Sequence, residues 1–226
     1  MYVSAGWGLG DTATTMSAYG YILKQKQIWL ESDGKRGANV VAINSSFGID
    51  RADCNTSEYV AWNDMFNELG KAGILSVAAT ANNGWDVDTV GDVPTACNSP
   101  YLISVTNTDI TGTRSGAGYG KTTIDLGAPG ESIYSTLPDN DFGSMSGTSM
   151  ATPHVTGSVG YLYSVANVAF LDRSLENPGE AALELKEAIL STVTARPDLK
   201  AETVSGGILN LAAASRALAN YAPRCN

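Results

Sequence analysis

Two short stretches of this chain are apolar almost without a break, and they limit its fold more than any other feature. They read VVAI at 40–43 and ILSVAA at 74–79. A strand with one face in water alternates apolar and polar residues, whereas a strand covered on both faces reads as a continuous apolar run. We therefore predict that both stretches are strands of a parallel sheet with helices on each side.

Further β-branched runs and helical patterns extend this prediction along the chain. Strands are expected at 1–5, 39–46, 73–81, 101–106 and 122–128, and helices at 12–31, 57–73, 180–193 and 208–219. Strands that alternate with helices require right-handed crossover connections, and hence a parallel sheet. The predicted fold is α/β, with three αβα layers around a mainly parallel central sheet. No repeat or low-complexity linker is present, so we expect residues 1–226 to form a single domain.

The helix predicted at 57–73 carries signals for its buried face and for both of its ends. Apolar side chains recur at i, i+3, i+4 and i+7, namely at Trp62, Met65, Phe66 and Leu69. This spacing puts them on one buried face. Ser57 is suited to cap the start, and Gly70 or Gly73 to end the helix.

Composition excludes several classes of function. Apolar residues make up 43% of the 226 residues, which is typical of a globular protein, and the formal net charge is −9. The acidic residues are scattered and no basic face is evident, so we expect no nucleic acid partner. Residues 142–171 hold no Asp, Glu, Lys or Arg but are rich in Ser, Thr and Gly. We expect a buried helix there and no membrane partner, because a membrane span needs about 20 mostly apolar residues.

Three cysteines occur, Cys54, Cys97 and Cys225, and the chain has a single histidine. Without CxxC spacing or further histidines, these residues do not form a zinc site. An odd number excludes complete internal pairing. A Cys54–Cys97 bridge is compatible with the sequence, but the sequence does not establish it.

The stretch FGSMSGTSMATPHVTG, residues 142–157, contains the best candidate nucleophile. Ser149 follows Gly147 by two residues and begins a helical pattern, so its hydroxyl is expected at a helix N-terminus, where the dipole favours negative charge. His154 is the only histidine. Five residues of helix turn its side chain about 140° away from Ser149. We therefore expect His154 to be a buried structural residue and not the base, with Pro153 in the first helical turn.

These residues carry a resemblance to a known family. GTSMATPHVTG at 147–157 resembles the nucleophile motif of the subtilases, the subtilisin-like serine peptidases, in which the residue at Ser149 is the nucleophile. VAATANNG at 77–84 resembles the strand that ends in the oxyanion asparagine, which implies that role for Asn82. The family usually has glycine where this chain has Ala81. A GxSxG hydrolase such as an esterase is excluded, because Gly147-Thr148-Ser149 lacks that spacing.

The resemblance also implies a substrate site. VVAINSSFG at 40–48 resembles the family strand whose last residues, here Ser46, Phe47 and Gly48, pair with an extended protein or peptide substrate. With these, Ala79 and Thr80 are implied to line the pocket for the side chain before the scissile bond. The implied activity is that of a serine endopeptidase, which forms an acyl-enzyme on Ser149.

The resemblance leaves the base unaccounted for. The family order is aspartate, histidine, serine, and only His154 is present here. Our expectation is that the chain is the carboxyl-terminal two-thirds of the family domain, inactive alone, and that a missing N-terminal segment of the same protein completes the triad. The alternative is a catalytically dead relative that binds peptides or partners. Secretion is implied by the resemblance and mildly by a possible Cys54–Cys97 bridge, while no signal peptide is visible.

No cofactor is expected for the chemistry. The loop at 85–92 offers the carboxylates of Asp86, Asp88 and Asp92. These are hard ligands of the kind calcium prefers, but their spacing is not that of an EF-hand. We assign no metal ligand in this chain and expect a solvated loop. Because subtilases often bind calcium, the resemblance implies a structural calcium somewhere in the whole protein.

Overall fold

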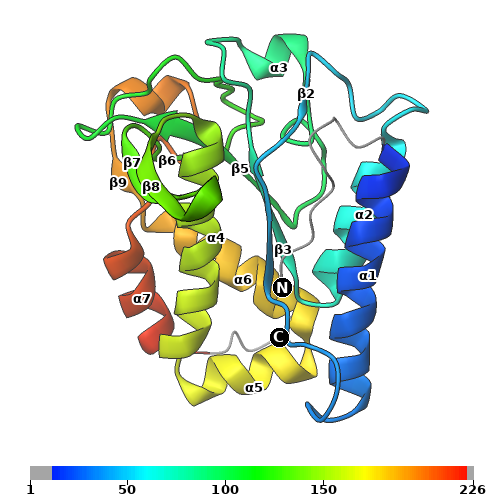
Figure 1. Ribbon diagram of the computed structural model, residues 1–226. Helices are drawn as coiled ribbons and strands as arrows, with labels where there is room; N and C mark the ends of the chain where they lie inside the picture. Colours follow the sequence, from blue (N-terminus) through cyan, green and yellow to red (C-terminus); the bar gives the residue numbers. More distant parts are fainter. Residues whose placement is uncertain (1–11, 223–226) are drawn as a thin grey trace.

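The computed structural model describes residues 12–222. Its central element is a six-stranded sheet (Figure 1). Its strand order is β1-β3-β5-β6-β10-β9, and every neighbouring pair is parallel except β9 and β10. The strands are β1 (Ala42–Ser45), β3 (Leu75–Ala79), β5 (Leu102–Thr108), β6 (Leu126–Pro129), β9 (Thr194–Ala195) and β10 (Gly207–Ile208). The strand predicted at 1–5 and Cys225 lie outside the described residues.

Helices cover both faces of this sheet. On one face lie α1 (Thr12–Glu31) and α2 (Val60–Lys71). On the other lie α4 (Thr148–Val165), α5 (Val168–Glu176), α6 (Pro178–Ser191) and α7 (Leu211–Ala219). Figure 1 shows α4 and α7 on one side of β3 and β5, and α1 and α2 on the other. The predicted α/β fold with three layers is confirmed.

The two helical layers enclose separate apolar cores. Alternate residues of one strand face opposite ways, so Val77 packs with the α4 layer while its neighbour Ala78 packs with α1 and α2. Every residue of β3 and β5 is buried. This two-sided burial is what the continuous apolar run at 74–79 predicted. In β1, by contrast, only Ile43 and Ser45 are buried and Asn44 is exposed.

The remaining elements are short and lie around the sheet. They are β2 (Ile49–Asp50), which pairs with β4 (Asp92–Val93), the helix α3 (Val87–Val90), and an antiparallel hairpin of β7 (Ile133–Leu137) and β8 (Asp141–Met145). Two 3₁₀ turns span Pro138–Asn140 and Asp198–Ala201. None of the helices within residues 12–222 has the length and apolar character that crossing a membrane would require.

The predicted start of α2 was wrong and its predicted end was right. The helix begins at Val60, and Tyr59 precedes it without a side-chain cap, so Ser57 is not the cap. At the other end, Gly73 has φ +84° and its N–H donates to Gly70 O, while the N–H of Ile74 donates to Leu69 O. This pair of bonds is the Schellman motif, which needs a left-handed residue after the helix.

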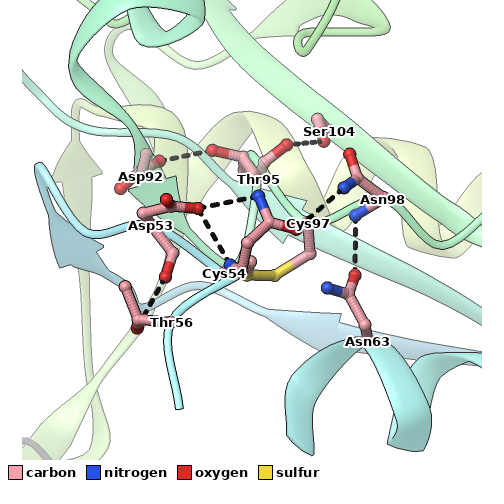
Figure 2. The surroundings of a disulfide bond; sticks show 10 residues. Asp53, Cys54, Thr56, Asn63, Asp92, Thr95, Cys97, Asn98 and Ser104 are labelled. Atoms are coloured by element: carbon pink, nitrogen blue, oxygen red, sulfur yellow. Dashed lines mark hydrogen bonds between the residues drawn. A yellow bond between two sulfur atoms is a disulfide. The ribbon is translucent and has the colours of Figure 1, made fainter. Parts of the chain in front are cut away.

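A disulfide joins Cys54 to Cys97, with their Cα atoms 5.2 Å apart. It links the segment after β2 to the segment after β4, and these two strands already pair. Figure 2 shows that Thr95 lies beside this bridge and bonds Asp92 on one side and Ser104 on the other. The disulfide and the strand pairing therefore brace the same pair of segments.

Replacing Gly73 by Ala should destabilise the fold by about 1–3 kcal/mol, because a side chain strains the left-handed conformation. A Cβ there would also lie 2.9 Å from the Cβ of Pro178. Urea unfolding monitored by circular dichroism measures the loss. Gly20→Ala is the control: this helical glycine has open space around it, so alanine should leave stability unchanged or raise it by up to about 1 kcal/mol. Equal changes in stability at the two positions would contradict the assignment of Gly73 as the left-handed residue that ends α2.

Replacing both Cys54 and Cys97 by Ser should lower the free energy of unfolding by about 4 kcal/mol, the chain-entropy value for a loop of this length. The two residues are 43 apart in sequence. Thermal unfolding of the parent with and without reductant, beside that of the double variant, measures the effect. A reductant-insensitive melting temperature in the parent would show that the bridge does not form.

Candidate active site

The candidate site lies where the carboxyl ends of β1 and β3 meet the first turn of α4. Crevices at the carboxyl ends of parallel strands are the usual ligand sites of such sheets. Ser46 follows β1, and its hydroxyl donates to Ser149 O at 2.9 Å. In return, Ser149 Oγ donates to Ser46 O at 3.3 Å. The structure thus brings together two residues that stand 103 positions apart in the sequence.

Thr148, the first residue of α4, connects this helix to the end of β3. Its side chain is fully buried, and its Oγ1 donates to Thr80 O at 2.6 Å and to Asn82 Oδ1 at 3.0 Å. Its backbone N–H also donates to Asn82 Oδ1, at 2.9 Å. Since the amide oxygen is engaged in this way, the NH2 group of Asn82 is the end of the side chain left for another partner. Within residues 12–222 that group makes no hydrogen bond.

Gly147 allows the approach between these two segments. Its φ is +144°, a conformation that favours glycine, and a Cβ there would lie 2.9 Å from Asn82 Oδ1. Ser149 then falls in the first turn of α4, as the sequence predicted. Amide N–H groups in a first turn have no partner within the helix. The N–H of Ser149 and the NH2 of Asn82 are therefore both candidates to bind an anionic oxygen.

The position of Pro153 differs from the prediction. Because α4 already begins at Thr148, Pro153 lies inside the helix and not in its first turn. Proline has no N–H, so the carbonyl four residues earlier loses its helical donor. That carbonyl belongs to Ser149, and it accepts the hydroxyl of Ser46 instead. The proline thus leaves an acceptor open for the residue that follows β1.

The prediction that His154 is buried was wrong. The residue is exposed, and its Nδ1 is 2.9 Å from Met150 O, one turn back in the helix. It lines an open groove of about 410 Å³ between α4 and the β7–β8 hairpin, together with Ser149 and Met150. No hydrogen bond joins His154 to Ser149 in the part of the chain that the structure describes. The expectation that it is not the base remains a prediction.

The residues predicted to bind substrate lie on either side of Ser149, but they differ in exposure. Phe47 is 43% exposed, with its ring centroid 6.4 Å from that of Trp62, and Gly48 is half-buried. Ala79 and Thr80 are buried, and the hydroxyl of Thr80 faces Asp92. Segments 46–48 and 79–82 therefore flank the start of α4.

The three carboxylates of the acidic loop do not converge on one point. Asp86 caps α3, and Asp88 accepts from the backbone of Thr122 and Thr123. Asp92 bonds Thr80 and Thr95 and is only 1% exposed, so the prediction of a solvated loop is wrong for this residue. No cluster of three or more metal-ligating side chains occurs among residues 12–222.

Sequence reasoning missed two residues of this region. Thr148 is part of the quoted motif, yet its bonds to β3 have no local signal, because its partners are 66 and 68 positions away. Asp92 was noticed only as an acidic loop residue. The apolar run that would have indicated its burial is too short, since β4 spans two residues.

Comparison with known proteins finds one family. The model described as the subtilase family matches residues 5–207. Subtilisin-like protease 2 of Trichophyton verrucosum is 35% identical over 161 residues, covering 69% of this chain and 35% of that protein. Thermitase of Thermoactinomyces vulgaris is 33% identical over 129 residues, covering 57% of this chain and 42% of that protein. The chain thus spans less than half the length of these curated relatives.

Two solved structures show the same fold. A structure of the prenylagaramide maturation protease PagA has a TM-score of 0.69 at 21% identity and covers 96% of this chain and 70% of that one. A structure of the subtilase cytotoxin SubAB assembly has a TM-score of 0.69 at 23% identity, with 91% and 65% covered. At these identities the likeness concerns the fold alone.

Thr148→Val should destabilise the chain by about 1–3 kcal/mol, because it removes a buried hydroxyl that bonds a carbonyl and an amide on another element. Thr152→Val is the matched control. It is buried in the same helix, but its hydroxyl bonds only Thr148 O within the helix, so its loss should be smaller. Urea unfolding with unchanged m-values measures both. A loss at Thr148 no larger than at Thr152 would contradict the tie to β3.

Proposed function

The chain belongs to the subtilase family, and from that premise we propose that it carries the nucleophile and oxyanion site of a serine endopeptidase. The observation that carries the proposal is the fixed placement of Asn82 beside the first turn of α4, through the bonds from Thr148. A hydroxyl nucleophile needs donors at the point where negative charge develops. The NH2 of Asn82 and the N–H of Ser149 are suited to supply them.

The proposed reaction is hydrolysis of a peptide bond through an acyl-enzyme. Ser149 Oγ attacks the carbonyl carbon while a base removes the hydroxyl proton, and the carbonyl oxygen becomes the oxyanion. Collapse of this intermediate breaks the C–N bond, and the leaving amine takes the proton from the base. Water then attacks the ester on Ser149 by the same route and releases the acid. To attack, Ser149 Oγ has to exchange its bond to Ser46 O for one to the base.

The base is proposed to come from a further segment of the same protein, joined to or docked on this chain. The support is that the sequence has one imidazole, His154, whose Nδ1 faces the carbonyl of its own helix. On this proposal the 226 residues alone are inactive or nearly so. The same observation favours a second candidate, a catalytically dead domain that binds peptides.

The substrate is proposed to be an extended peptide that adds a strand beside Ser46–Gly48. In such pairing the backbone gives affinity, and pockets for single side chains give specificity. The support is that this segment continues β1 and bonds the first turn of α4. Ala79 and Thr80 flank the same turn from β3 and are the proposed opposite wall.

We also propose a secreted protein. The support is the disulfide between Cys54 and Cys97, because such bridges persist mainly in oxidising compartments.

Hydrolysis of a fluorogenic peptide by the full-length protein should fall to background in Ser149→Ala. Asn82→Asp should lower kcat by about 10²–10³, the loss known for subtilisin when its oxyanion amide is removed. This variant keeps the oxygen that binds Thr148 but loses the donor. Asn83→Asp is the matched control, since it adds the same charge one residue away at an exposed position, and its kcat should change little.

Two outcomes would contradict parts of this proposal. Turnover by residues 1–226 alone that depends on Ser149 would show that no further segment supplies the base. A full-length protein that binds peptides but leaves them intact would favour the catalytically dead alternative.

A further inference from the structure

Asp92 is a buried carboxylate that lies near both of the proposed substrate walls. It begins β4 and pairs with Asp50 of β2, the strand that directly follows Ser46–Gly48. Its Oδ2 accepts the hydroxyls of Thr80, at 3.1 Å, and of Thr95. These bonds fix the carboxylate under the end of β3.

The other oxygen of Asp92 faces the opposite wall. A Cβ placed on Gly48 would lie 3.7 Å from Asp92 Oδ1. The same Cβ would lie 2.8 Å from Val93 O, so glycine allows segment 46–48 to pass this close to β4. Gly48 and Thr80 belong to the two segments proposed to hold the residue before the scissile bond, and the carboxylate lies between them.

Within the part of the chain that the structure describes, the carboxylate of Asp92 forms no ion pair. Burial raises its pKa to about 6, and the nearby charge of Asp50 acts in the same direction, while the bonds from Thr95 and Thr80 lower the pKa. A cation that bonds to a desolvated carboxylate of this kind strongly stabilises its ionised form.

We propose that Asp92 is a specificity-determining residue that selects lysine or arginine as the side chain before the scissile bond. The proposal rests on the proposed function, which defines that pocket. The ammonium or guanidinium group would enter between Ser46–Gly48 and Ala79–Thr80 and donate to Oδ1, while the two threonines keep Oδ2 in place. An apolar side chain in the same position would leave the buried charge without a cation, so peptides with an apolar side chain there should bind less tightly.

The alternative role of Asp92 is a brace only. The bond from Thr80 ties Asp92 to the end of β3, and the bond from Thr95 ties it to the segment that the disulfide holds (Figure 2). A brace predicts that losing the carboxylate lowers stability without changing which peptides bind. Selection predicts a change in preference between peptides of equal shape and different charge, so the two roles give different results.

The test measures peptide binding in the full-length protein carrying Ser149→Ala, so that no peptide is consumed. Two fluorescent peptides are compared by anisotropy, identical except for arginine or its neutral isostere citrulline before the scissile position. The arginine peptide should bind about 10- to 100-fold more tightly. Asp92→Asn should reduce this ratio to about one while leaving the citrulline affinity unchanged, which also shows that the variant is folded. Asp50→Asn, on the paired strand and exposed, should keep the ratio.

Equal affinities in the parent, a ratio that survives Asp92→Asn, or no binding of either peptide would overturn the proposal. The comparison in the parent decides this even if Asp92→Asn does not fold. A cleavage profile of the protein with Ser149 intact tests the proposed peptidase activity separately from the proposed selection of lysine or arginine. Arginine-selective binding without cleavage would refute the peptidase and leave the selection standing. Cleavage without lysine or arginine before the cut bond would refute the selection alone.

Discussion

The bonds from Thr148 to the end of β3 are the contact on which the candidate site depends. Thr148 is fully buried and is the first residue of α4, and it uses both its N–H and its hydroxyl on this one strand end. Buried polar groups that are paired in this way hold one arrangement, because any other leaves them unsatisfied. The position of Ser149, the next residue, follows from this contact.

A second tie comes from β1 and depends on a break in the helix itself. Pro153 has no backbone N–H to donate to Ser149 O. The hydroxyl of Ser46 donates to this oxygen instead. The segment 46–48 is thereby fixed to α4 on one side, while the β2–β4 pairing and the disulfide fix the chain just beyond it. The site is thus built from the first turn of α4 and from two loops whose ends are held by the sheet, and such loops commonly carry functional residues.

The sequence predicted the layers of the fold well, because apolar runs and helical spacing are local signals. Helix α1 has the predicted bounds, and β3 and β5 lie within one or two residues of theirs. The wrong helix starts, at Ser57 and before Pro153, are shifts of a few residues, whereas two other errors concern features decided by distant partners. The exposure of His154 depends on what covers α4, and the burial of Asp92 depends on Thr80 and Thr95. The β7–β8 hairpin was not predicted, since most of its residues are exposed and give no apolar pattern.

The exposed imidazole of His154 also has a practical consequence. It is the only one in the 226 residues, so its ring protons give a single pair of resonances in an NMR spectrum, with no assignment needed. The ring lies in the groove beside Ser149 and the β7–β8 hairpin. Its chemical shift is therefore a built-in reporter for any segment or peptide that comes to lie over that face of the molecule.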